Sequence, residues 1–412
     1  MFREIARCRI CGNTELVPVL DLGHQALTGL FPKSASQDVE QMPLELVKCQ
    51  GDAHCGLLQL RHTGDLARMY GENYGYRSGL NRSMVQHLRG KVRRILDRVP
   101  ASAGDLVIDI GSNDGTTLRA YPNELALVGI DPTGEKFRSF YPSHVELIPD
   151  FFSAATLRDR YGARKARIVT SFSMFYDLED PTSFMREVHG ILADDGIWVF
   201  EQSYMPTMLE RNSYDTVCHE HLEYYGLRQI QWMAQEVGFR ILDVEFNDVN
   251  GGSLSVTVAK GRSPLASNEA NVTCTLSREH DLGLHTLAPY RAFEERVSEH
   301  RRNLIGLLHE INSSGKRVLG FGASTKGNVI LQYCGLTDRD LTCIAEVNED
   351  KFGAFTPGSL IPIVPEAEAR RMKPDFFLVL PWHFRDAILS REAEFLRAGG
   401  RFVFPMPSVT VV

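Results

Sequence analysis

The sequence predicts an α/β protein with two sheets of the doubly wound type and a small cysteine-rich domain at the N-terminus. At two places, 106–115 and 317–328, an apolar strand runs into a glycine-bearing loop that opens a helix. In doubly wound sheets, ligands bind at such loops, beyond the carboxyl ends of parallel strands. Four of the eight cysteines lie ahead of both sheets, within the first 55 residues. Two loops of this type in one chain predict two ligands.

Length and composition limit the classes of protein to consider. The chain has 412 residues, which is enough for two or three domains, and its 43% hydrophobic and 24% charged residues are values typical of globular proteins. A formal charge of −7 gives no general attraction to nucleic acid or to an anionic membrane, so neither is an expected partner. The sequence has no apolar signal at its start and no apolar run of the roughly 18–20 residues that a membrane span needs. We expect a cytoplasmic protein that is a monomer or a small homo-oligomer.

The early cysteines have the spacing of a metal site. Cys8 and Cys11 form a C-x2-C pair, and Cys49 and Cys55 form a second pair that encloses His54 as an alternative ligand. Four thiolates from two turns make the closed tetrahedral set that structural zinc prefers, and they leave no open position for catalysis. A reducing compartment favours metal over disulfides, although a set of unligated thiols is the alternative.

The first glycine loop has the properties of a nucleotide site. Gly111 and Gly115 let the backbone pass close to a ligand, and we expect a helix to begin near Thr116. The loop is not G-x-G-x-x-G, which counts against a dinucleotide. Asp131 ends the next buried strand, where an acid suits hydrogen bonding to ribose hydroxyls.

Further along the chain, Asp150 and Phe151 are suited to frame an adenine ring, with a carboxylate near its amino edge and an aromatic wall. Together with the glycine loop, these residues resemble the class I S-adenosylmethionine-dependent methyltransferases. The resemblance implies that Asp109, Gly111 and Asn113 surround the methionine and ribose, that Asp131 holds the ribose, and that Asp150 and Phe151 hold the adenine. An α/β domain that binds another adenosine compound is the alternative.

The second half of the chain predicts the end of this sheet and the start of another. Segments 238–245 and 251–258 are predicted to be antiparallel closing strands joined by a tight turn at 250–253. Residues 262–300 are polar, become helical and bridge to the second α/β sheet. There, the amides of a helix N-terminus make a candidate phosphate cradle with the side chains of Ser324, Thr325 and Lys326. A purely structural glycine turn is the alternative.

A cluster of proton-transferring groups occupies 214–225. It contains His219, Glu220 and His221, with tyrosines on both sides. The spacing is not that of a zinc protease, because the residue four after His219 is Glu223. A solvated loop, a helix start with core histidines and part of a metal site are the alternatives.

These motifs together resemble the three-domain sugar C-methyltransferases over essentially the whole chain. That family methylates C-3 of nucleotide-linked 4-keto-6-deoxyhexoses. The resemblance implies a zinc-binding domain at 1–72, a methyltransferase domain at 73–262 and a Rossmann-like nucleotide-sugar-binding domain at 263–412. It predicts S-adenosylmethionine and structural zinc as cofactors and a nucleoside-diphosphate sugar as substrate, held by Ser324, Thr325, Lys326 and His383.

The resemblance also predicts catalytic residues. The second histidine of the His-Glu-His motif is the family's base, here His221, which would remove a proton next to a ketone to give an enolate. Glu220 would orient a neighbouring group, and Tyr76 falls where the family has an active-site tyrosine. The role of His219 is unassigned.

Two positions depart from the family pattern. Several relatives have tyrosine where this chain has Cys218, and some have a histidine near 174–177. Tyr176, Tyr224 or Tyr225 is expected to substitute, and Tyr224 is counted with the catalytic residues. An O-methyltransferase of a small metabolite and a nucleotide-binding regulatory protein without turnover are the rival functions.

Overall fold

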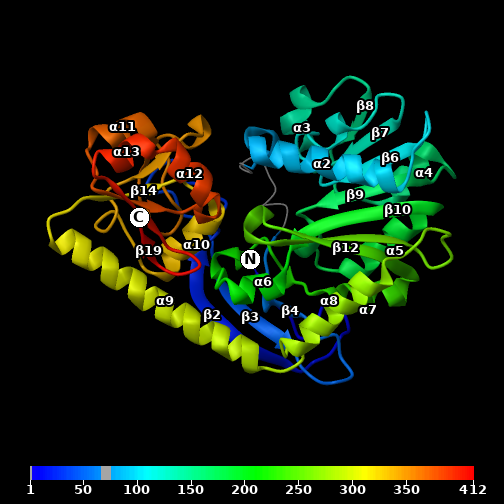
Figure 1. The fold of residues 1–412 in the computed structure, drawn as a ribbon, viewed down its shortest axis with the longest axis horizontal. Helices are drawn as coiled ribbons and strands as arrows, with labels where there is room; N and C mark the ends of the chain where they lie inside the picture. The colour runs from blue at the N-terminus through cyan, green and yellow to red at the C-terminus, as the bar shows by residue number, and fades with distance from the viewer. Residues whose placement is uncertain (1, 66–75) are drawn as a thin grey trace.

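The computed structural model describes residues 2–65 and 76–412. Figure 1 shows two α/β bodies side by side, with the N-terminal strands β2 and β3 below and between them and the long helix α9 along the outer side. No helix of the described chain has both the length and the apolarity to cross a bilayer.

The larger body is built on a seven-stranded sheet in the order β12-β13-β10-β9-β6-β7-β8. β6 to β10 run parallel, and β13 pairs antiparallel with both β10 and β12. The first strand of this sheet in the chain, β6, lies in the middle; β7 and β8 follow on one side of it, and β9 is added on the other side. The gap between β6 and β9 is therefore the switch point, where doubly wound sheets bind ligands. The strands are β6 (Leu106–Ile110), β7 (Ala126–Ile130), β8 (Val145–Ile148), β9 (Ala166–Phe172), β10 (Leu192–Ser203), β12 (Phe239–Asn247) and β13 (Ser253–Lys260).

Helices cover both faces of this sheet, and their starts follow the capping rules. The Asn81 side chain accepts a hydrogen bond from Ser83 N at the start of α2, and Asp180 caps α5, whose first turn contains Pro181. The strand residues between the helices are almost fully buried, as Val107 and Ile168 show. The helices of this body are α2 (Arg82–Arg98), α3 (Gly134–Phe137), α4 (Ala154–Tyr161), α5 (Pro181–Ile191), α6 (Met205–Glu210) and α7 (Leu227–Val237).

The prediction of a helix that begins near Thr116 is wrong. The chain makes a turn there, followed only by a short 3-10 helix, Leu118–Ala120. The Asp114 carboxylate accepts hydrogen bonds from the amide and hydroxyl of Thr116, which favours a turn. Tyr121 then takes an extended ψ of 152° because the next residue is Pro122, which disfavours helix before it.

The second body carries a six-stranded sheet in the order β16-β15-β14-β17-β18-β19, parallel except for β19. Its helix α10 starts after the second glycine loop, as predicted. The 26-residue helix α9 precedes the first strand of this sheet, β14. The strands are β14 (Val318–Phe321), β15 (Ile344–Glu346), β16 (Ile363–Pro365), β17 (Phe376–Val379), β18 (Arg401–Phe404) and β19 (Thr410–Val411). The helices are α8 (Glu269–Asp281), α9 (Ala288–Ser313), α10 (Thr325–Tyr333), α11 (Glu366–Arg371), α12 (Arg385–Arg391) and α13 (Ala393–Arg397).

The N-terminal sheet has four strands in the order β11-β4-β3-β2, and its edge strand comes from the middle of the chain. β2 (Leu16–Ala26), β3 (Gln41–Cys49) and β4 (Leu58–Leu60) are consecutive, whereas β11 is Glu223–Tyr224. A further pair, β1 (Arg3–Glu4) with β5 (His62–Thr63), lies beside it. The sheet therefore includes residues from the predicted methyltransferase domain. The predicted boundary at 72 lies outside the described residues, and the domain limits stay predictions.

Candidate active site

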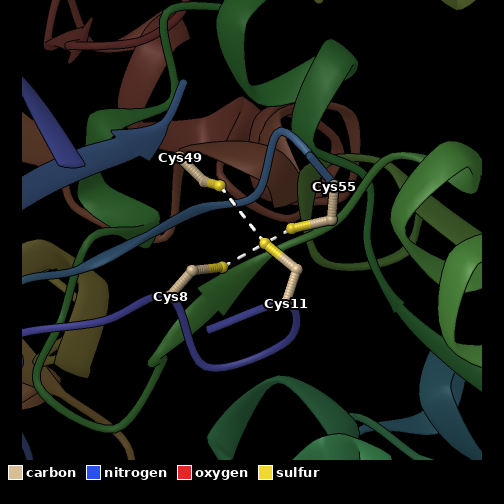
Figure 2. Close-up of side chains that lie close together, drawn as sticks. All are labelled: Cys8, Cys11, Cys49 and Cys55. Atoms are coloured by element: carbon tan, nitrogen blue, oxygen red, sulfur yellow. Dashed lines mark hydrogen bonds between the residues drawn. The ribbon is translucent and has the colours of Figure 1, made fainter. Parts of the chain in front are cut away.

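The four cysteines predicted to bind zinc come together at one end of the N-terminal sheet. Figure 2 shows their sulfur atoms turned toward a common centre. All four lie within 4.8 Å of one another, with 3.5 Å between the sulfurs of Cys8 and Cys55 and 3.5 Å between those of Cys11 and Cys49. Zn–S bonds of about 2.3 Å in a tetrahedron place sulfurs about 3.8 Å apart, so the set fits zinc with all positions filled. His54 is not part of this group.

A cavity of about 250 Å³ opens beyond the carboxyl ends of β6 and β9. Its size and its position at the switch point of the sheet suit a nucleoside ligand. The lining residues include most of those predicted to bind the cofactor, namely Asp109, Gly111, Asn113, Asp150 and Phe151, and they also include Tyr76, Phe152, Met174 and Asp177.

The glycine loop of this cavity needs its glycine. Gly111 has a φ of +72°, and a Cβ atom there would lie 3.0 Å from Met174 Cγ. Next to it, Asn113 Oδ1 accepts from Ser78 N at 2.9 Å and Asn113 Nδ2 donates to Tyr76 O at 3.1 Å. The side chain of Asn113 thus holds the 76–78 segment over the cavity. Tyr76 itself is 47% exposed.

The two acids at the ends of β6 and β7 differ in their surroundings. Asp109 lines the cavity, is 2% exposed and accepts from Thr170 Oγ1 at 2.6 Å. Burial raises the pKa of Asp109 to about 7. The carboxylate of Asp131, predicted to hold a ribose, instead accepts from Asn113 N at 2.7 Å and from Thr133, and Asp131 is not among the lining residues. In this structure Asp131 fixes the glycine loop.

His221 has one ring nitrogen bonded and the other available. Its Nδ1 lies 2.8 Å from the carbonyl oxygen of Thr216. A carbonyl oxygen only accepts, so Nδ1 carries the proton of the neutral ring and Nε2 is left as the basic nitrogen. The Tyr176 ring lies 4.3 Å from the His221 ring. Burial, and then the nearby charge of Lys326, lower the pKa of His221 to about 3.

The residues on either side of His221 face the N-terminal domain. His219 Nε2 is 3.1 Å from Met42 O, and the Oε2 atom of Glu220 is 3.4 Å from Thr28 Oγ1. Burial raises the pKa of Glu220. Tyr224 is 3% exposed, and its hydroxyl points to Thr216 O at 3.5 Å, behind the loop.

Lys326 and Trp382 of the C-terminal domain contact the loops around His221. Lys326 Nζ donates to Asn250 O, in the hairpin between β12 and β13, at 2.9 Å. Trp382 Nε1 donates to Asp215 Oδ2, in the loop of His221, at 2.7 Å. Burial, and then the charge of Lys326, lower the pKa of His383 to about 3.

The residues of the predicted phosphate cradle therefore point in different directions. Ser324 Oγ caps α10 by accepting from Gly327 N at 3.0 Å, and Thr325 is the first residue of that helix. Lys326 extends away from its own helix toward the methyltransferase sheet. His383 follows Trp382, whose indole contacts Asp215 in the loop of His221.

Comparison with known proteins covers all parts of this architecture. A family described as "Putative zinc binding domain" matches residues 8–70, "Methyltransferase domain" matches 84–244 and "C-methyltransferase C-terminal domain" matches 248–407. The C-methyltransferase NovU of Streptomyces niveus is 32% identical over 416 residues, which cover 100% of this chain and 97% of that protein. The chain belongs to the C-methyltransferase family.

The C-methyltransferase has the class I methyltransferase fold and uses S-adenosylmethionine, and its N-terminal domain is a zinc-binding domain with a four-cysteine cluster. Among solved structures, the YcgJ protein of Bacillus subtilis and an S-adenosylmethionine-dependent methyltransferase of Clostridium acetobutylicum align with TM-scores of 0.33 and 0.34. They are 16% and 12% identical and cover 42% and 43% of this chain, and 98% and 92% of their own. The sheet order and the family match assign the fold.

Sequence reasoning missed three residues that shape the C-methyltransferase site. Asp215 is 1% exposed, and its Oδ1 atom has no hydrogen-bond partner among the described residues. Trp382 and Thr28 touch the loop of His221 from the C-terminal and N-terminal domains. Asp215 was visible inside the 214–225 cluster, whereas nothing in the sequence places Trp382 or Thr28 beside it.

Proposed function

We propose that this C-methyltransferase transfers the methyl group of S-adenosylmethionine to C-3 of a nucleoside-diphosphate 4-keto-6-deoxy sugar. The observation that carries the proposal is His221, whose Nδ1 proton is fixed on Thr216 O and whose Nε2 is the available base. Lys326 of the C-terminal domain lies close enough to lower the pKa of that base. The full-length similarity to the C-methyltransferase NovU supports the same reaction class.

The chemistry follows from the neutral imidazole. His221 Nε2 takes the proton from C-3, and the electron pair of the broken C–H bond forms an enolate with the adjacent C-4 ketone. The developing negative charge sits on the ketone oxygen, where the positive charge of Lys326 stabilises it. S-adenosylmethionine, when bound, supplies the methyl group as an electrophilic sulfonium carbon, which the C-3 nucleophile requires.

Other residues receive supporting roles in this proposal. Glu220 orients the sugar or the base, and Tyr76 covers the acceptor from the rim of the cofactor cavity. Tyr176, whose ring packs on His221, is better placed to assist than Tyr224, which points behind the loop. Ser324, Thr325, Lys326 and His383 bind the nucleotide sugar, and Asp131 supports the ribose site through the glycine loop that it fixes. The domains divide at 1–72, 73–262 and 263–412.

A hydrogen-exchange experiment tests the base. The wild-type enzyme with S-adenosylhomocysteine in deuterated water should exchange the C-3 hydrogen of a keto sugar without methyl transfer. His221→Asn should lose both exchange and turnover while binding S-adenosylhomocysteine with unchanged affinity. The matched control is His309→Gln, because His309 is exposed on α9 and contacts Ser313 Oγ, and it should retain exchange.

Two results would count against the proposal. Wild-type exchange in His221→Asn would remove the base assignment. Methylation of a hydroxyl group, with no exchange at carbon in any variant, would instead assign the enzyme to O-methyl transfer.

A further inference from the structure

Arg9 lies inside the zinc knuckle, between the ligands Cys8 and Cys11, and its guanidinium points away from them. Its Nη1 donates to Leu60 O at 2.6 Å and its Nη2 donates to Thr63 Oγ1 at 2.7 Å. Its Nε is 3.6 Å from Oε1 of Glu223, and the two side chains are only 4% and 0% exposed. A buried contact between a guanidinium and a carboxyl group therefore joins the zinc knuckle to β11.

Glu223 depends on this partner. Neither of its carboxylate oxygens has a hydrogen-bond partner among the described residues. Burial raises the pKa of Glu223, and the charge of Arg9 opposes that effect. Because a buried guanidinium is costly without an acidic group beside it, the contact with Arg9 fixes where the Glu223 side chain lies.

Glu223 stands two residues after His221, in a segment that the N-terminal domain holds along its length. Leu60 N donates to Leu222 O at 2.9 Å, and β11 pairs with β4 in the register Glu223 to Gln59. Upstream, His219 contacts Met42 O, as described above. The N-terminal domain therefore holds the backbone after the base and the His219 side chain before it, although these segments are more than 150 residues apart in the chain.

We propose that Arg9 is a positioning residue for methyl transfer, which carries the geometry of the zinc knuckle to the His221 base through its buried pair with Glu223. The inference rests on the proposed function, since it takes His221 as the base. It gives the structural zinc a defined link to catalysis, because Cys8 and Cys11 set the position of Arg9. It also explains why β11, which follows His221 in the chain, lies at the edge of the N-terminal sheet.

The test uses a pair of substitutions that leaves no buried charge behind. Arg9→Met together with Glu223→Gln should fold and retain one equivalent of zinc and the wild-type affinity for S-adenosylhomocysteine. Its kcat should fall at least 10-fold with little change in KM, because the base is displaced while both ligands still bind. The ¹⁵N resonance of His221 Nδ1 should shift as its hydrogen bond to Thr216 O changes.

The control is the Arg61–Glu45 pair of the same domain, with 3.0 Å between Arg61 Nε and Glu45 Oε2 and side chains 25% and 21% exposed; among the described residues, no side-chain hydrogen bond or ion pair links it to the loop of His221. Arg61→Met with Glu45→Gln should leave kcat and the resonance unchanged. Glu223→Gln alone, which leaves Arg9 bonded to Leu60 and Thr63, is the second variant and should also lower kcat.

A wild-type kcat and an unshifted resonance in both Glu223 variants would overturn the inference. The resonance distinguishes this outcome from failure of the proposed function. If His221→Asn keeps exchange and turnover, His221 is not the base, yet a shifted Nδ1 signal would still show that Arg9 positions the ring.

Discussion

For single residues, we predict that Asp109 makes cofactor binding depend on pH. Burial raises the pKa of Asp109 to about 7, so below pH 7 the carboxyl is largely protonated. If it pairs with the ammonium group of the methionine moiety, only the ionised form binds well. Affinity for S-adenosylhomocysteine should therefore fall about tenfold per pH unit below 7 and level off above it, as titration calorimetry at pH 6, 7 and 8 can measure.

Asp109→Asn is the control for this dependence. The amide is neutral at every pH, so the variant should bind weakly and with the same affinity from pH 6 to 8. A wild-type dissociation constant that does not change over this range would show that Asp109 does not titrate on binding.

His221 should have different basicity in the free and the substrate-bound enzyme. Its lowered pKa, about 3, keeps the imidazole neutral throughout pH 5 to 8, so kcat/KM should have no acid limb from this residue there. A bound diphosphate would offset the charge of Lys326, the second cause of the low pKa, and raise it. We expect the acid limb of kcat at a higher pH than that of kcat/KM.

Lys326→Met tests how much the charge of Lys326 lowers the pKa of His221. Without the lysine, the pKa of His221 in the free enzyme should rise and the acid limb of kcat/KM should move up toward that of kcat. Coincident limbs in the wild-type enzyme would contradict the electrostatic link.

Among the elements, the long buried strands and the hairpin turn near 250–253 were predictable, whereas the turn after β6 and the two-residue strand β11 were not. The segments 106–110, 238–245 and 251–258 have the apolar and β-branched residues of buried strands, and the structure places strands there. The helix expected near Thr116 failed because the hydrogen bonds of Asp114 and the effect of Pro122 outweighed helix propensity. β11 could not be predicted, because two residues carry no periodic pattern.

The hairpin between β12 and β13 gives a prediction about stability. Gly252 has a φ of +128°, and a Cβ atom there would lie 2.4 Å from Thr207 Cγ2. Gly252→Ala should therefore lower the free energy of unfolding by about 1–3 kcal/mol, as chemical denaturation can measure. Gly306→Ala, in α9 with open space around it, is the control and should be neutral or stabilising. Equal stability of the two variants would show that the turn relaxes.

At the scale of the whole molecule, the zinc ligands and the cofactor loop could be predicted because each is a local motif. Cys8 and Cys11, or Gly111 with its strand, are close in the chain, so spacing alone identifies them. The acceptor side could not be predicted in the same way. Lys326 was assigned to its own helix N-terminus, but its Nζ bonds to Asn250 O in another domain. Such contacts depend on how whole domains dock, which local patterns do not encode.

The hydrogen bond from Trp382 Nε1 to Asp215 Oδ2 is one of the contacts that tie the C-terminal domain to the loop of His221. Asp215 is 1% exposed and its other oxygen has no partner within the described chain, so loss of the indole donor leaves the carboxyl without a side-chain donor. Trp382→Phe should lower the free energy of unfolding by about 1–3 kcal/mol. Because the two faces of the acceptor site would no longer be fixed, it should raise KM for the sugar while leaving affinity for S-adenosylhomocysteine unchanged. Trp232→Phe, on the half-buried face of α7, is the matched control, and a sugar KM that changes equally in both variants would contradict a specific role for the Trp382 contact.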